Sequence, residues 1–66
     1  MKYYKVTNYF GGVCKLFDTY DEAAALFNER MAKNDDILEL IEITHDNGGY
    51  HGEAIKIYNF GKYYTI

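Results

Sequence analysis

The sequence predicts an α+β domain in which one antiparallel sheet carries a single helix on one face. Three observations predict it: one capped amphipathic helix, β-type sequence on both sides of that helix, and a turn signal within each β-type segment. The predicted order of elements is ββαββ, two hairpins joined by a helix. With 66 residues the chain makes one domain, 1–66, and its core must be small.

The helix is predicted over Thr19–Lys33. Thr19 and Glu22 form a capping box, in which the hydroxyl of Thr19 can bond the backbone amide of Glu22 and the Glu22 side chain can reach back toward Thr19. Asn34 tolerates the left-handed conformation that commonly ends a helix. At the helical period, one apolar stripe that we expect to face the sheet contains Tyr20, Ala23, Ala24, Phe27 and Met31, with Leu26 at its flank.

Aromatic and β-branched residues predict strands over 2–10, 13–17, 37–44 and 50–60. Gly11-Gly12 and Asp46–Gly49 have the composition of tight turns. The third strand is apolar on both sides, which favours a central position in a sheet of four strands. After Gly61, residues 62–66 form either a short fifth strand or a tail.

Alternation along each strand predicts two different faces of the sheet. We expect the aliphatic faces to meet the helix, which places Val6, Cys14, Leu16, Ile55 and Ile57 in contact with it. The opposite face alternates aromatic residues with lysines, and one helix cannot cover both faces. The face expected to stay open carries Tyr3, Lys5, Tyr9, Lys15, Phe17, Lys56 and Tyr58.

Three interpretations of this aromatic and basic face stay open. Lysine stems can lie over tyrosine rings on an ordinary solvated sheet. Tyrosine is also an efficient anchor residue, so the face can bind a protein partner, including a second copy of the chain. Finally, rings among lysines can stack and hold single-stranded nucleic acid or a nucleotide signal, with Lys5, Lys15 and Lys56 as the cations.

The charges are distributed unevenly, although the net charge is only −3. All ten acidic residues lie between positions 18 and 53, whereas most lysines lie in the flanks. Solvation and helix capping explain some of these acids. The alternative is that Asp35, Asp36, Glu39 and Glu42 steer the protein to a basic partner surface, such as a nucleic-acid site.

No group of residues predicts catalysis, and we expect a protein that is not an enzyme. His45 and His51 flank the second turn and could face each other across the hairpin, but two histidines without further ligands do not define a metal site. Cys14 is the only cysteine, which excludes an internal disulfide and fits a reducing cytoplasm. No metal, cofactor or membrane contact is expected, since no apolar run approaches the roughly 20 residues of a membrane span.

At the level of class, the chain resembles the small anti-defence inhibitors of bacteriophages, which include the anti-CRISPR proteins. The features that carry the resemblance are the brevity, the isolated helix Thr19–Lys33, tyrosine-rich strands such as residues 2–5, and the acidic middle from Asp18 to Glu53. The resemblance implies a non-enzymatic, often dimeric protein that acts in the host cytoplasm by occupying a nucleic-acid or effector site or by locking the conformation of a partner. It assigns no functional residue.

Overall fold

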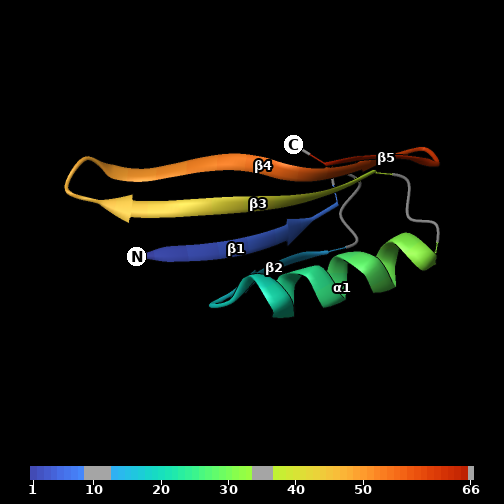
Figure 1. The fold of residues 1–66 in the computed structure, drawn as a ribbon, viewed down its shortest axis with the longest axis horizontal. Helices are drawn as coiled ribbons and strands as arrows, with labels where there is room; N and C mark the ends of the chain where they lie inside the picture. Colours follow the sequence, from blue (N-terminus) through green and yellow to red (C-terminus); the bar gives the residue numbers. More distant parts are fainter. Residues whose placement is uncertain (9–12, 34–36, 66) are drawn as a thin grey trace.

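A computed structural model describes residues 1–8, 13–33 and 37–65, and it confirms the predicted α+β class (Figure 1). One helix and five strands follow one another along the chain. Their bounds are β1 Lys2–Thr7, β2 Cys14–Phe17, α1 Tyr20–Ala32, β3 Ile37–Asp46, β4 Gly49–Asn59 and β5 Lys62–Thr65. Of the two alternatives predicted for residues 62–66, the structure shows the short fifth strand, over Lys62–Thr65. No helix in these three ranges is long and apolar enough to cross a membrane.

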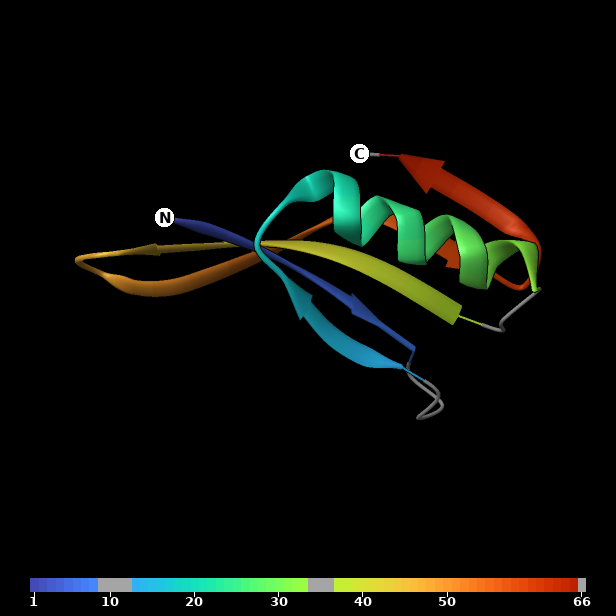
Figure 2. The ribbon, with the colours of Figure 1, turned by 90° about the horizontal axis from the view of Figure 1, so that it is seen from below.

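The five strands form one antiparallel sheet in the order β2-β1-β3-β4-β5. β3 is the central strand, as its two-sided hydrophobicity predicted. The helix α1 lies on one side of this sheet, where it contacts β1, β3 and, at the edge, β2, and no other described element covers the opposite side (Figure 2). The turn between β3 and β4 extends beyond the helix, so the molecule is elongated, with extents of 37, 21 and 17 Å.

The helix begins where the capping box predicted. Thr19 Oγ1 accepts a hydrogen bond from the backbone N–H of Glu22 at 3.3 Å, and the Thr19 hydroxyl donates to the Glu22 carboxylate at 2.9 Å. Lys33 is the C-cap residue. The predicted role of Asn34 lies outside the described residues, as do Gly11 and Gly12.

The core lies between α1 and the centre of the sheet. Among the described residues, its buried side chains are Val6, Ala23, Phe27, Leu38, Leu40 and Tyr58. The helical stripe predicted from the sequence supplies Ala23 and Phe27, and Ala24, Leu26 and Met31 pack beside them. Tyr20, at the end of the stripe, is 37% exposed and meets the ring of Tyr4 edge-on at 5.9 Å between centroids.

Two short turns join the last three strands. In the first, the side chain of Asp46 accepts a hydrogen bond from the backbone of Gly48 at 2.8 Å, and Gly49 adopts a φ of 108°. The Asp46–Gly49 turn predicted from the sequence is thus confirmed. The second turn consists of Phe60 and Gly61, both with positive φ, as a two-residue type I′ hairpin requires.

Phe60 is unfavourable in this turn, because a left-handed conformation costs a residue other than glycine about 1–2 kcal/mol. Its side chain is 64% exposed, so it contributes little to the core. We expect Phe60→Asn to raise the free energy of unfolding by about 1 kcal/mol, since asparagine tolerates positive φ. Urea denaturation measures the change. Phe60→Leu keeps the strain and should bring no gain; equal stability of the two variants would contradict the explanation.

The face predicted for β2 is wrong, and in β4 the prediction is wrong for Lys56, Ile57 and Tyr58, whereas Ile55 packs against the core as predicted. Residues opposite each other in an antiparallel ladder point to the same side of the sheet. Lys15 pairs with the buried Val6, and Phe17 pairs with Tyr4, so these β2 side chains share the helix side. Cys14 and Leu16 therefore point away from α1, and both are exposed.

In β4 the prediction also selected the wrong face for Lys56 and Tyr58. Tyr58 pairs with the buried Leu38 and is only 7% exposed, and Lys56 pairs with the buried Leu40. Both lie on the helix side. The register then shifts, because Leu40 pairs with Lys56 while the next residue, Ile41, pairs with Ala54. This irregularity leaves Ile55 without a partner of its own in β3, and Ile55 packs against the core.

Candidate functional site

The side of the sheet that α1 leaves uncovered is the candidate functional site, and we call it the open face. Its members follow from the ladder register, since each lies opposite another residue that points away from the helix. The open face consists of Tyr3, Lys5, Thr7, Cys14, Leu16, Ile37, Glu39, Ile41, Ile43, His45, Tyr50, Ala54, Ile57, Asn59, Lys62 and Tyr64. Most of these side chains are apolar or aromatic, which is unusual for the uncovered side of a small sheet.

Large apolar side chains on this face are well exposed. The exposed fractions are 64% for Leu16, 69% for Tyr50 and 50% for Tyr64. Tyr50 is held in place by His45, whose ring stacks on the tyrosine at 4.3 Å between centroids with an interplanar angle of 11°. Exposed apolar side chains on one face of a sheet usually mark an interaction surface when they are grouped into a patch.

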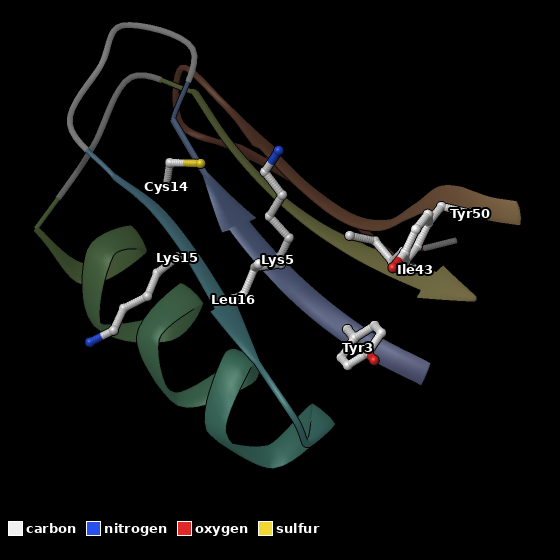
Figure 3. A pocket seen from close by; sticks show the side chains of 7 residues that line it. All are labelled: Tyr3, Lys5, Cys14, Lys15, Leu16, Ile43 and Tyr50. Carbon is white, nitrogen blue, oxygen red and sulfur yellow. The ribbon is translucent and has the colours of Figure 1, made fainter. Parts of the chain in front are cut away.

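Part of the open face is hollowed. A hollow of about 660 Å³ lies over β1, β2 and the turn-proximal ends of β3 and β4 (Figure 3). In Figure 3, Tyr3, Ile43 and Tyr50 lie together at one end, and Lys5 and Cys14 lie toward the other. The residues that line it are Tyr3, Lys5, Cys14, Lys15, Leu16, Ile43 and Tyr50.

A second hollow of about 480 Å³ continues from the first around the β2 edge to the start of α1. Tyr3, Lys15 and Leu16 line both hollows. The second hollow adds Asp18 and Glu22, both exposed, at the N-terminus of the helix. The apolar surface is thus bordered by carboxylates on this side.

Only one of the three lysines predicted on this face has its place there. Lys5 belongs to the open face, opposite Leu16 and Ile41. Lys15 reaches the rim of both hollows from the edge strand, but its amine points away from that of Lys5 (Figure 3). Lys56 lies on the helix side, as do the predicted aromatic residues Phe17 and Tyr58. Tyr9 lies outside the described residues.

Lys56 instead belongs to an aromatic cluster between α1 and β5. Its Nζ lies 5.4 Å from the ring centroid of Tyr20 and 5.9 Å from that of Tyr63. Hydrogen bonding to Tyr20 raises the pKa of Lys56 above its usual value. The hydrogen bond from Thr65 to the Tyr63 hydroxyl, at 2.8 Å, lowers the pKa of Tyr63.

This placement makes Lys56 a structural residue. We expect Lys56→Ala to lower the free energy of unfolding by about 0.5–1 kcal/mol, the usual contribution of an accessible cation–π contact. Lys62→Ala removes the same charge from an exposed position in β5 and should change stability much less. Chemical denaturation compares the two. Equal effects would show that charge alone, and not the ring contacts, accounts for the loss.

The predicted acidic set does not form one group. Asp35 and Asp36 lie outside the described residues. Glu39 belongs to the open face, whereas Glu42 points to the opposite side and lies 3.2 Å from the Lys2 amine. Glu42 also accepts a hydrogen bond from the Tyr4 hydroxyl at 3.4 Å. Successive side chains of a strand point to opposite faces, so residues three positions apart, such as Glu39 and Glu42, lie on different sides of the sheet.

The histidines do not face each other. His45 pairs with Tyr50 and belongs to the open face, while His51 pairs with Thr44 on the other side and lies 3.6 Å from Asp46. Within residues 1–8, 13–33 and 37–65, no three histidine, cysteine or carboxylate side chains are grouped so as to hold a metal ion. Cys14, predicted to be buried against the helix, is exposed at the hollow.

Sequence reasoning missed Leu16, Ile43 and Tyr50 as members of the site. The two-sided hydrophobicity of the third strand was the signal that could have found Ile43, since a strand that is apolar on both sides needs a cover on both sides. Leu16 and Tyr50 gave no comparable signal, because their face depends on strand register. No protein-family model, curated protein or solved structure matches the chain.

Proposed function

We propose that the protein is a non-enzymatic binding protein that docks its open face on a protein partner and acts as a stoichiometric inhibitor or adaptor. The observation that carries this proposal is the hollow with exposed Leu16 and Tyr50 on a sheet face that no described element covers. Aromatic and aliphatic anchors around a concave centre are the usual composition of the energetically dominant part of a protein interface.

Charge indicates the chemistry of the partner. Asp18 and Glu22 border the second hollow, and Asp21 lies beside them at the start of α1. An apolar contact surface with basic residues at its margin would complement this arrangement. A host defence complex that handles nucleic acid offers such a surface, so the phage-type inhibitor predicted from the sequence is the specific form of the proposal.

Binding of single-stranded nucleic acid on the sheet receives less support. That function required Lys5, Lys15 and Lys56 to act together, and these lysines point in different directions. We expect fluorescence anisotropy with a labelled single-stranded oligonucleotide to show no binding at low salt. Binding that weakens with salt and is lost in Lys5→Ala would favour the nucleic-acid function instead.

A direct test of docking is affinity capture from the cells that produce the protein. The double variant Tyr3→Ala, Tyr50→Ala removes two anchors from one end of the hollow, and it should lose the captured partner. Asn28→Ser, at an exposed position of α1, is the matched control and should retain it. Circular dichroism establishes that both variants are folded. Retention of the same partner by the double variant would contradict docking through the open face.

A further inference from the structure

The edge strand β2 is a second candidate interaction surface. It could bind another strand through backbone hydrogen bonds as well as through side chains. Among the elements that the structure describes, β2 pairs with β1 alone, and α1 contacts β1, β3 and β2 from one side of the sheet without pairing with the outer edge of β2 (Figure 2). Cys14, Lys15 and Leu16 are all exposed. An uncovered edge of this kind is a template for another strand.

The ladder shows which backbone groups are free to pair. The N–H of Asn8 donates to the carbonyl of Val13 at 2.9 Å, so these residues form a hydrogen-bonded pair. Hydrogen-bonded and non-bonded pairs alternate in an antiparallel ladder. Lys15 and Phe17 therefore direct their backbone groups toward β1, whereas Cys14 and Leu16 direct theirs outward.

We propose that the occupant of this edge is a second copy of the chain, paired antiparallel through β2 with Leu16 opposite Leu16 of the second copy. A two-fold axis perpendicular to the sheet then relates the copies. This register brings the outward backbone groups of both Leu16 residues together. It also places each exposed leucine side chain against its equivalent, which removes both from water.

Charge favours this register over the adjacent register, in which Cys14 lies opposite Leu16 of the second copy. Moving the second copy so that Cys14 lies opposite Leu16 would place Lys15 directly against Lys15 of the second copy, and like charges in that position are destabilising. With Leu16 at the centre, Lys15 lies opposite Phe17 of the second copy. Lys15 already lies 5.7 Å from the ring of its own Phe17, so the dimer extends an existing cation–π contact.

The dimer has a consequence for the open face. A perpendicular two-fold axis keeps both open faces on the same side of one continuous ten-stranded sheet. Leu16 lines both hollows at the edge of each copy, so the hollows of the two copies meet at the axis. The additional burial would also support a chain whose own core is small. Because the dimer covers Leu16, a further partner would contact the rest of each hollow, at Tyr3, Ile43 and Tyr50. The inference does not depend on docking of such a partner.

Light scattering after size-exclusion chromatography, over micromolar to sub-millimolar concentrations, tests the proposal. The wild type should have twice the mass of the 7.7 kDa chain. Leu16→Lys should reduce the mass to that of a monomer, because it places two lysines opposite each other at an exposed position. Asn28→Lys adds the same charge to the exposed side of α1, and it should remain dimeric.

Oxidative cross-linking tests the register. In the background Cys14→Ser, the variant Leu16→Cys should form an intermolecular disulfide, since opposite residues of a hydrogen-bonded pair have a Cα separation of about 5.5 Å, within the range that a disulfide spans. Tyr64→Cys in the same background reports on the other free edge, β5, and should stay reduced. A monomeric wild type, a dimer that survives Leu16→Lys, or cross-linking at position 64 instead of 16 would overturn the proposal.

Discussion

Phe27→Ala is expected to leave most of the protein unfolded at room temperature. Phe27 is completely inaccessible at the centre of α1, where its ring lies 6.1 Å from that of Tyr63. Removing a buried phenylalanine costs about 3–5 kcal/mol. The free energy of unfolding is typically roughly 0.05–0.15 kcal/mol per residue, or about 3–10 kcal/mol for a chain of this length. The expected loss is therefore comparable with the total stability of the protein.

Far-ultraviolet circular dichroism during thermal denaturation measures this effect. Asn28→Ala changes the adjacent, exposed position of the same helix and should keep a cooperative transition close to that of the wild type. A Phe27→Ala variant that melts cooperatively within a few degrees of the wild type would show that the core does not depend on the contact between α1 and the sheet.

Tyr58→Ala is the second substitution with a large expected effect, because it tests which face of β4 is buried. Tyr58 is 7% exposed on the helix side, whereas Tyr64, in β5, is 50% exposed on the open face. We expect Tyr58→Ala to lower the free energy of unfolding by about 3 kcal/mol, at the low end for a buried aromatic residue. Tyr64→Ala should cost less than about 1 kcal/mol, as surface substitutions usually do.

Urea denaturation of the two variants gives the comparison directly. The sequence, considered without the structure, placed Tyr58 on the open face, where its removal would be cheap. Similar costs for Tyr58→Ala and Tyr64→Ala would support that placement and contradict the packing of β4 against α1.

Local signals were sufficient to predict the order of elements. The capping box at Thr19 and Glu22 fixes the start of the helix through bonds among neighbouring residues, and the Asp46–Gly49 turn likewise forms its own hydrogen bond. The central position of β3 was predictable because its apolar residues occur on both sides. None of these inferences required knowledge of which strand lies opposite which.

Side-chain orientation could not be obtained in the same way, because it depends on register. Alternation shows that Lys56 and Tyr58 share a face, but it does not show which face meets the helix. Aliphatic character does not identify the core face here, because the sheet is apolar on both sides and the core includes the tyrosine ring of Tyr58. The register shift opposite Leu40 and Ile41 also interrupts the alternation of faces along β4, because Ile55 has no partner in β3.

The sequence therefore predicted some residues of the open face but not others. Tyr3 and Lys5 lie on the open face, as expected from strand β1. The other expected lysines do not, and their places are taken by Leu16, Ile43 and Tyr50, which make the face more apolar than basic. This composition supports the protein-binding interpretation of the face more than the alternative, binding of a nucleic-acid strand.

Site-specific photo-cross-linking in the producing cells tests most directly whether the open face is the binding surface. A photoreactive phenylalanine analogue in place of Tyr50 sits at the hollow, and the same analogue in place of Asn28 sits on the exposed side of α1. Docking through the open face predicts a covalent adduct with a discrete protein from position 50 and none from position 28. An adduct from position 28 alone would contradict it and assign binding to the helix.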